Sequence, residues 1–110
     1  MYRIGQEELK AVERVLGARA LFKINSTEQD ALHAEEEMKE KFGVDHALLM
    51  TSGHAALASA LVGMGIGPGD EVITTPFTFF ATAETIAMVG ATPVFVDVDE
   101  DTYNIDASKM

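Results

Sequence analysis

The chain has 110 residues, enough for one small domain with a core and too few for two. Its apolar content of 47% excludes a disordered chain, and its net charge of −10 at pH 7 argues against a surface for nucleic acid or an anionic membrane. Because the chain has no cysteine and residues 1–20 contain no long apolar run, we expect a cytoplasmic protein without disulfides, thiolate chemistry, a signal peptide or a membrane span.

The first predicted element is an amphipathic helix. Leu9, Val12 and Leu16 recur at helical spacing, which predicts a helix over residues 6–16 that stops at Gly17. The basic residues of the chain are concentrated in this first third, so its helices should expose a charged face to solvent.

A second helix is predicted after a short connection. Residues 21–25 indicate a short extended piece or a turn. Ser26 followed by Gln29 matches a capping box, in which the two side chains satisfy backbone N–H groups at a helix start. The apolar spacing carries this helix to about Phe42, with Gly43 as its C-cap.

From residue 44 onward the sequence alternates between predicted strands and helices. Short apolar or β-branched runs predict strands at residues 46–50, 71–75 and 93–97, and the segments between them predict helices at residues 53–64 and 79–89. This order favours an α/β fold, a three-layer αβα arrangement around a mostly parallel sheet. The first of these helices is apolar nearly all round and must be covered on both sides. Three strands cannot do this, so we expect missing sheet, a partner chain, or both.

The turn before that helix reads Thr51-Ser52-Gly53-His54-Ala55 and lies at the carboxyl end of the first predicted strand. In open α/β sheets, ligands bind at this edge, and the free N–H groups of a helix start favour an anion. Gly53 would let the backbone approach that anion closely. Ser-Gly before a helix is also ordinary capping, so a phosphate site and a simple cap both stay open here.

Other motifs predict no further phosphate or metal site. The glycine-rich residues 63–70 fit no G-x-G-x-x-G frame and precede a strand instead of a helix. Asp97, Asp99 and Asp101 resemble the start of a calcium loop, but Gly and Glu are missing where that loop requires them. The three histidines show no metal-ligand spacing. We therefore predict that the chain holds no metal.

Phe79 follows the second predicted strand at the same sheet edge. A phenylalanine in this position is commonly part of a core. A flat ring beside an anion site would also suit a planar, phosphorylated cofactor.

Four strings in one order resemble the DegT/StrS family of sugar aminotransferases: Ser-Gly-x-Ala-Ala-Leu, Gly-x-Gly-Pro-Gly-Asp-Glu-Val-Ile, Thr-Phe-x-Ala-Thr and Pro-Val-Phe-Val-Asp-Val-Asp. The resemblance is strong over residues 44–106 and weaker over residues 1–43. It implies a fold-type-I enzyme that uses pyridoxal 5′-phosphate (PLP). Residues 1–43 would be an N-terminal helical segment, and residues 44–110 the first part of the PLP-binding large domain.

The resemblance also implies roles for individual residues. His54 and Ala55 would bind the cofactor phosphate beside Gly53, and Phe79 would stack on the pyridine ring. The family transfers an amino group, usually from glutamate or glutamine, to a keto sugar that is often nucleotide-linked. Its members are homodimers with active sites at the interface, so these small molecules and a second copy of the chain are the expected partners.

The sequence departs from the family pattern at two places. His54 stands where the family has Thr, and its imidazole could replace the lost hydroxyl contact or point away from the phosphate; both alternatives stay open. The Gly-Pro turn that commonly precedes the second helix is absent from residues 21–30, which puts substrate contacts from that region in doubt.

Catalytic residues of the family are missing from the chain. The lysine that binds PLP and the aspartate that pairs with the pyridine nitrogen come later in the family pattern, and no lysine lies in residues 42–108. We therefore predict an N-terminal fragment that does not catalyse transamination alone and that self-associates or is poorly soluble. The alternatives are a non-catalytic regulatory or binding relative, a PLP-dependent sugar dehydratase, and an interaction fragment without a ligand.

Overall fold

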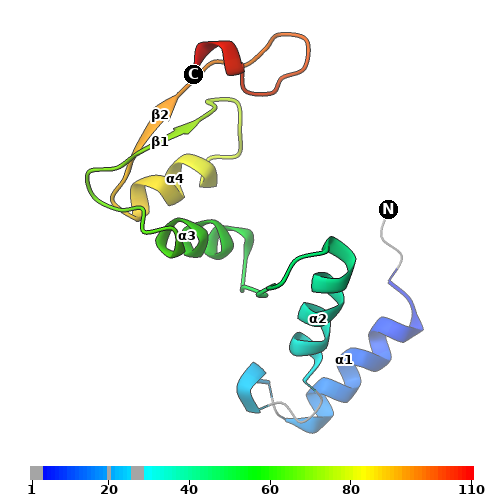
Figure 1. Cartoon of the computed structure of the whole chain (residues 1–110). Helices are drawn as coiled ribbons and strands as arrows, with labels where there is room; N and C mark the ends of the chain where they lie inside the picture. Colours follow the sequence, from blue (N-terminus) through cyan, green and yellow to red (C-terminus); the bar gives the residue numbers. More distant parts are fainter. Residues whose placement is uncertain (1–3, 20, 26–28) are drawn as a thin grey trace. The chain divides into compact units, whose positions relative to one another are not determined.

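The computed structural model describes residues 4–19, 21–25 and 29–110. It divides into two compact units, Met1–Leu49 and Met50–Met110. Figure 1 shows helices in the first unit, and helices with a small sheet in the second. No helix in the described part of the chain is long and apolar enough to cross a membrane.

The first unit contains two α-helices and a short 3₁₀ turn. Helix α1 spans Gln6–Ala18, η1 spans Lys23–Asn25, and α2 spans Asp30–Phe42. Helix α1 passes through Gly17 because Arg19 takes over the left-handed capping position and donates its N–H to the Leu16 carbonyl. Gly17 is therefore not the stop that the sequence predicted.

The second helix confirms one predicted cap and leaves the other outside the described residues. Gly43 ends α2 in the left-handed conformation, with φ of 65°, which glycine adopts at little steric cost. The helix begins at Asp30, after Gln29 in a left-handed conformation. Ser26, the other half of the predicted capping box, lies outside the described residues.

The predicted strand at residues 46–50 is wrong for this structure, because these residues belong to no strand. A strand is stabilised by a ladder of hydrogen bonds to a neighbour, and the two strands of the described chain pair with each other. The Leu49 N–H donates instead to the Glu35 carboxylate, with N and Oε1 2.8 Å apart. An apolar run predicts a strand, but it does not show whether a neighbouring strand is present to pair with it.

The second unit is built on a parallel pair of strands. Helix α3 spans Gly53–Gly63 and α4 spans Ala81–Met88, while β1 spans Glu71–Thr74 and β2 spans Thr92–Phe95. The register pairs the first residue of β1 with the first of β2, and the last with the last. Two of the three predicted strands and the α/β class are thus confirmed. In Figure 1, α4 lies next to the sheet, and α3 lies next to α4.

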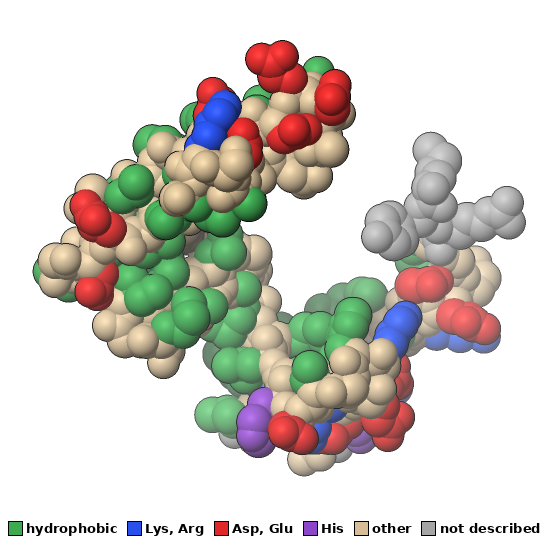
Figure 2. Space-filling model, turned by 45° about the horizontal axis from the view of Figure 1, so that its top comes forward, with side chains coloured by type: hydrophobic (Ala, Val, Ile, Leu, Met, Phe, Trp, Pro, Cys, Tyr) green, Lys and Arg blue, Asp and Glu red, His purple; other side chains and the backbone are tan. Residues whose placement is uncertain are grey.

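The core of this unit lies among α3, α4 and the sheet. Its buried members are Leu61, Ile86 and Ala91, with partly buried Ile66, Val72 and Val89 packed around them. Much apolar surface stays uncovered in the same unit, and Figure 2 shows hydrophobic side chains on its outside. On α3 the exposed apolar side chains include Leu57 and Val62. This exposed apolar surface is the one that missing sheet or a partner chain would cover, and through which the chain would self-associate, in the predictions from sequence.

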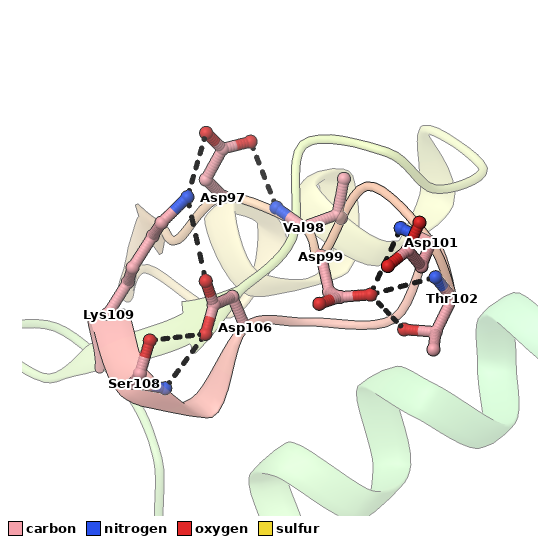
Figure 3. Close-up of polar contacts among 8 residues, drawn as sticks. All are labelled: Asp97, Val98, Asp99, Asp101, Thr102, Asp106, Ser108 and Lys109. Carbon is pink, nitrogen blue, oxygen red and sulfur yellow. Dashed lines mark hydrogen bonds and ion pairs between the residues drawn. The ribbon is translucent and has the colours of Figure 1, made fainter.

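Figure 3 shows the hydrogen bonds and ion pairs within the acidic segment that follows β2. Asp99 accepts hydrogen bonds from the backbone and hydroxyl of Thr102 and from the backbone of Asp101, and these bonds hold the pKa of its carboxyl below the usual value. Asp106 likewise accepts from Ser108 at the start of the last 3₁₀ turn, η2 (Ala107–Lys109). The carboxylates therefore shape a loop, and no group of three or more potential metal ligands gathers within the described residues.

Candidate functional site

The starts of α3 and α4 border one hollow of about 790 Å³. From the first helix and its cap it is lined by Ser52, Gly53, His54, Ala56, Leu57 and Ala60, and residues 79–82 line it from the second. Gly53, His54 and Phe79, which are separated in sequence, thus share one surface. Ala55 is not among the lining residues. The segment after β1 reaches the start of α3, because both segments line this one hollow.

The N-terminus of α3 leaves two backbone donors for an outside acceptor. Ser52 is the N-cap, and its Oγ accepts the Ala55 N–H at 3.1 Å while its carbonyl accepts the Ala56 N–H at 3.0 Å. The N–H groups of Gly53 and His54 have no acceptor among the described residues. An anion at this turn would therefore meet these two N–H groups first, and it would share the Ala55 N–H with Ser52.

The space in front of the turn is open. A Cβ added to Gly53 would meet no atom of the described chain within 4 Å, apart from its immediate chain neighbours and the backbone of its own helix. The Ser52 hydroxyl, which accepts one hydrogen bond, still has its own proton to donate. Thr82 adds a second hydroxyl to the hollow, and its Oγ1 lies 3.0 Å from that of Thr78. Two N–H groups and two hydroxyls suit the oxygens of a phosphate.

His54 turns its imidazole toward α4. Its Nδ1 lies 3.5 Å from Oε2 of Glu84, and the two side chains are 33% and 47% exposed. The sequence left the direction of this imidazole open and did not single out Glu84 as a partner. A signal was present, because Glu84 is the only acidic residue between Val72 and Val96. An isolated carboxylate in an apolar stretch marks a position that needs a polar partner or solvent.

Phe79 is not a core residue in this structure. It is 73% exposed, and it precedes α4 instead of lying inside it. Its ring centroid is 4.9 Å from that of Phe80, with the ring planes tilted by 54°. Because both rings line the hollow, they form an aromatic wall beside the polar turn. Such a wall can pack against a planar ring whose phosphate lies at the turn.

No amine lines this hollow within the described residues. The described lysines of the first unit are Lys10, Lys23, Lys39 and Lys41. In the second unit, Lys109 lies 3.5 Å from an oxygen of Asp97 and 3.6 Å from one of Asp106. These carboxylates raise the pKa of Lys109 above its usual value and keep the amine protonated, so it is a poor nucleophile. The hollow offers recognition of a ligand without a covalent attachment point.

Comparison with known proteins gives a consistent match. A model of the DegT/DnrJ/EryC1/StrS aminotransferase family covers residues 2–110. The chain is 48% identical over 107 residues to the spore coat polysaccharide biosynthesis protein SpsC of Bacillus subtilis, which is 97% of this chain and 26% of that protein. It is 45% identical over 87 residues to the GDP-perosamine synthase of Caulobacter vibrioides, or 79% of this chain and 24% of that one.

A further relative is named for regulation, whereas the two relatives above are named for biosynthesis. The pleiotropic regulatory protein of Geobacillus stearothermophilus is 55% identical over 65 residues, which is 59% of this chain and 18% of that protein. The chain thus spans about a quarter, or less, of the length of the curated relatives it matches.

Solved structures share the fold over nearly the whole chain. An aminotransferase from Psychrobacter cryohalolentis superposes with a TM-score of 0.90 at 40% identity, covering 97% of this chain and 27% of that one. The PLP-form of the sugar aminotransferase Spr1654 from Streptococcus pneumoniae gives a TM-score of 0.85 at 31% identity, covering 94% and 26%. The cofactor named in that structure is the one that the sequence resemblance implied.

Proposed function

Because the chain belongs to the DegT/DnrJ/EryC1/StrS aminotransferase family, we propose that it forms the first part of a PLP-dependent aminotransferase acting on a keto sugar. The observation that supports this most directly is the shared hollow, where a helix start with two N–H groups unpaired among the described residues and an aromatic wall meet. The GDP-perosamine synthase among the relatives favours a nucleotide-linked sugar as substrate. Glutamate or glutamine is the proposed amino donor.

In this proposal the chain binds and orients the cofactor. The N–H groups of Gly53 and His54 and the Ser52 hydroxyl hold the phosphate, the Ala55 N–H is shared with Ser52, and the Phe79 ring packs on the pyridine. The bound PLP supplies the electron sink for amino-group transfer. None of these residues is a catalytic nucleophile, so the lysine that binds PLP belongs to a part of the protein outside these 110 residues.

The proposal also covers the cellular location and the oligomeric state of the protein. We place the protein in the cytoplasm, in agreement with a chain that has no cysteine. We also propose a homodimer, because the exposed apolar side chains of α3 and the sheet need covering. Residues 1–43 would form its N-terminal helical segment, and residues 44–110 would begin the large domain.

A second candidate function is a regulatory relative that keeps the fold without transamination. One observation favours it, the 55% identity to the pleiotropic regulatory protein over 65 residues. The PLP-dependent sugar dehydratase would use the same hollow, and the residue at the PLP-binding lysine position would separate it from the aminotransferase.

The test uses the product of the complete reading frame. Replacing the exposed ring by Phe79→Ala should weaken PLP retention by about 1–3 kcal/mol, the scale of one aromatic contact and its burial. Retention is measured by equilibrium dialysis and by the cofactor's absorbance. The matched control is Phe77→Ala, since Phe77 packs on Tyr103, 5.6 Å between ring centroids, and does not line the hollow.

The outcomes separate the candidates. Loss of PLP in Phe79→Ala alone, with amino transfer to a nucleotide-linked keto sugar by the unmodified protein, supports the aminotransferase. PLP binding without turnover of any amino donor favours the regulatory relative. Equal PLP affinity in Phe79→Ala and the unmodified protein would remove Phe79 from the site.

A further inference from the structure

Two threonines stand at the ends of the Thr-Phe-x-Ala-Thr string, and the proposed function uses only the phenylalanine between them. In the structure, Oγ1 of Thr78 and Oγ1 of Thr82 lie 3.0 Å apart and form a hydrogen bond between two hydroxyl groups. Thr82 lines the hollow together with Phe79, whereas Thr78 is not one of the lining residues. The contact of Thr78 with the hollow therefore runs through Thr82.

Helix capping, the ordinary role of a threonine before a helix, does not describe Thr78. The N-cap of α4 is Phe80, whose side chain makes no capping hydrogen bond. Thr78 precedes this N-cap by two positions, and its hydroxyl bonds a side chain of the first turn instead of a backbone N–H. The backbone N–H groups of Thr82 and Ala83 donate to the carbonyls of Phe79 and Phe80, at 3.0 and 3.1 Å. The hydroxyl bond therefore closes residues 78–82 into a turn around Phe79.

The Phe79 ring lacks the packing that would hold it in one direction. It is 73% exposed, and the Phe80 ring beside it, 4.9 Å away between centroids, is 65% exposed. A core side chain is held by contacts on all sides, whereas the direction of an exposed ring follows from the backbone that carries its Cβ. The bond between Thr78 and Thr82 spans that backbone, so it restrains the ring without touching it.

We propose that the hydrogen bond between Thr78 and Thr82 fixes the direction of the Phe79 ring for stacking, with Thr78 as a positioning residue. This inference rests on the proposed function, because the ring to be stacked is the pyridine of the cofactor. Water competes for both hydroxyls in the cofactor-free protein, and a ligand in the hollow covers Thr82 and removes part of this competition. The hydrogen bond and the bound ligand therefore stabilise each other.

The probe is pyridoxine 5′-phosphate, which keeps the ring and the phosphate of PLP but has no aldehyde to bond to a lysine. Its dissociation constant is measured by titration calorimetry on the cofactor-free product of the complete reading frame. Thr78→Val replaces the hydroxyl by a methyl group, and Thr78→Ser keeps the hydroxyl. Thr78→Val is also combined with Phe79→Ala to close a double-mutant cycle. The control is Thr92→Val, at an exposed threonine of β2 that does not line the hollow.

We expect Thr78→Val to bind the probe about fivefold more weakly than the unmodified protein, the scale of one neutral hydrogen bond. Thr78→Ser should restore most of this affinity, and Thr92→Val should match the unmodified protein. In the Phe79→Ala background, Thr78→Val should leave the dissociation constant unchanged, because the ring that it orients is gone. A general loss of stability would weaken binding in both backgrounds, so the cycle isolates the positioning role.

The spectrum of bound PLP gives a second measurement. The circular dichroism of the cofactor's visible absorption band depends on the asymmetric surroundings of its ring. At saturating PLP, this signal should be smaller in Thr78→Val than in the unmodified protein, and it should return in Thr78→Ser. Saturation removes the difference in affinity, and a variant that merely folds less well would give the same signal for each bound cofactor.

The possible failures are distinguishable. Weaker binding by Phe79→Ala with unchanged binding by Thr78→Val overturns the inference and leaves the proposed function standing. An equal effect of Thr78→Val in both backgrounds also overturns it, since Thr78 would then act without Phe79. Failure of Thr78→Ser to restore affinity overturns the role of the hydroxyl. Unchanged binding by Phe79→Ala removes the ring from the site, and absence of binding by the unmodified protein overturns the proposed function; either result overturns the inference with it.

Discussion

Each of the two units of the chain is stabilised internally by a different kind of interaction. In the described part of the first unit, the one buried residue is an acid, Glu35, which is 6% exposed. It accepts both hydrogen bonds from Lys23 Nζ, at 2.6 and 2.7 Å, and one from the Leu49 N–H. In the second unit, the buried residues are mostly apolar and gather around Ile86.

This difference predicts how each unit responds to its surroundings. Apolar packing has no direction and changes little with pH, but it is sensitive to the shape of each core side chain. A buried carboxylate stabilises the fold only while it is ionised and its hydrogen-bond partners remain in place. The first unit should therefore respond to pH, and the second to changes of volume and backbone shape.

The largest effect is expected from Ile86→Ala in the second unit. Ile86 is 3% exposed and central to its core, so the change removes three carbon atoms and leaves a cavity. The free energy of unfolding should fall by about 2–4 kcal/mol, and by about 1 kcal/mol in the graded variant Ile86→Val. Urea unfolding gives the total, and hydrogen exchange locates the loss of protection. Equal loss of protection in residues 4–49 would contradict the independence of the two units.

A smaller effect is expected from Gly90→Ala, which tests backbone shape. Gly90 has φ of 86°, and a Cβ there would lie 2.9 Å from Cγ of Pro68. The left-handed strain and this clash should cost about 2–3 kcal/mol. The matched control is Gly17→Ala in α1, where a Cβ meets nothing within 4 Å and alanine favours the helix. Thermal unfolding should show Gly90→Ala destabilised and Gly17→Ala unchanged or slightly stabilised; the reverse order would contradict the structure of this turn.

The smallest effect, and the one confined to acid, is expected from Glu35→Gln. The hydrogen bonds from Lys23 and then from Leu49 hold the pKa of the Glu35 carboxyl below its usual value. A lowered folded-state pKa means that the native state binds fewer protons, so this stabilisation is present above the usual pKa of Glu and is lost as pH falls through the lowered value. The stability gap between the unmodified protein and Glu35→Gln should therefore be full at neutral pH and close in acid.

Unfolding by urea at a series of pH values measures this gap. The control is Glu36→Gln, because Glu36 neighbours Glu35 but is 67% exposed and pairs with Lys39 at the surface. An exposed pair of this kind contributes little, so Glu36→Gln should show a small difference from the unmodified protein at every pH. A gap for Glu35→Gln that stays constant into acid would show that the first unit does not depend on this carboxylate.

Much of the secondary structure followed from the sequence. The four α-helices of the described chain were predicted, two of them from apolar spacing, and the alternation of strands and helices predicted β1 and β2 with their parallel pairing. Gly43 caps its helix as predicted, and Ser52 caps α3, which is one of the two roles that the sequence left open. These features are local, because a helix start or a glycine cap depends on a few neighbouring residues. The family string around Gly53 and Phe79 was also readable without coordinates.

Contacts between distant residues could be learned only from the tertiary structure. Residues 46–50 read as a strand, but pairing depends on a neighbour that a single apolar run cannot reveal. The direction of the His54 imidazole depends on Glu84, 30 positions away in sequence, which packing brings to 3.5 Å. Whether Phe79 is buried or faces a hollow depends on how α4 packs on α3. Sequence pattern determines which elements form, whereas packing decides which side chains meet, because that choice depends on distances between elements that local propensities do not contain.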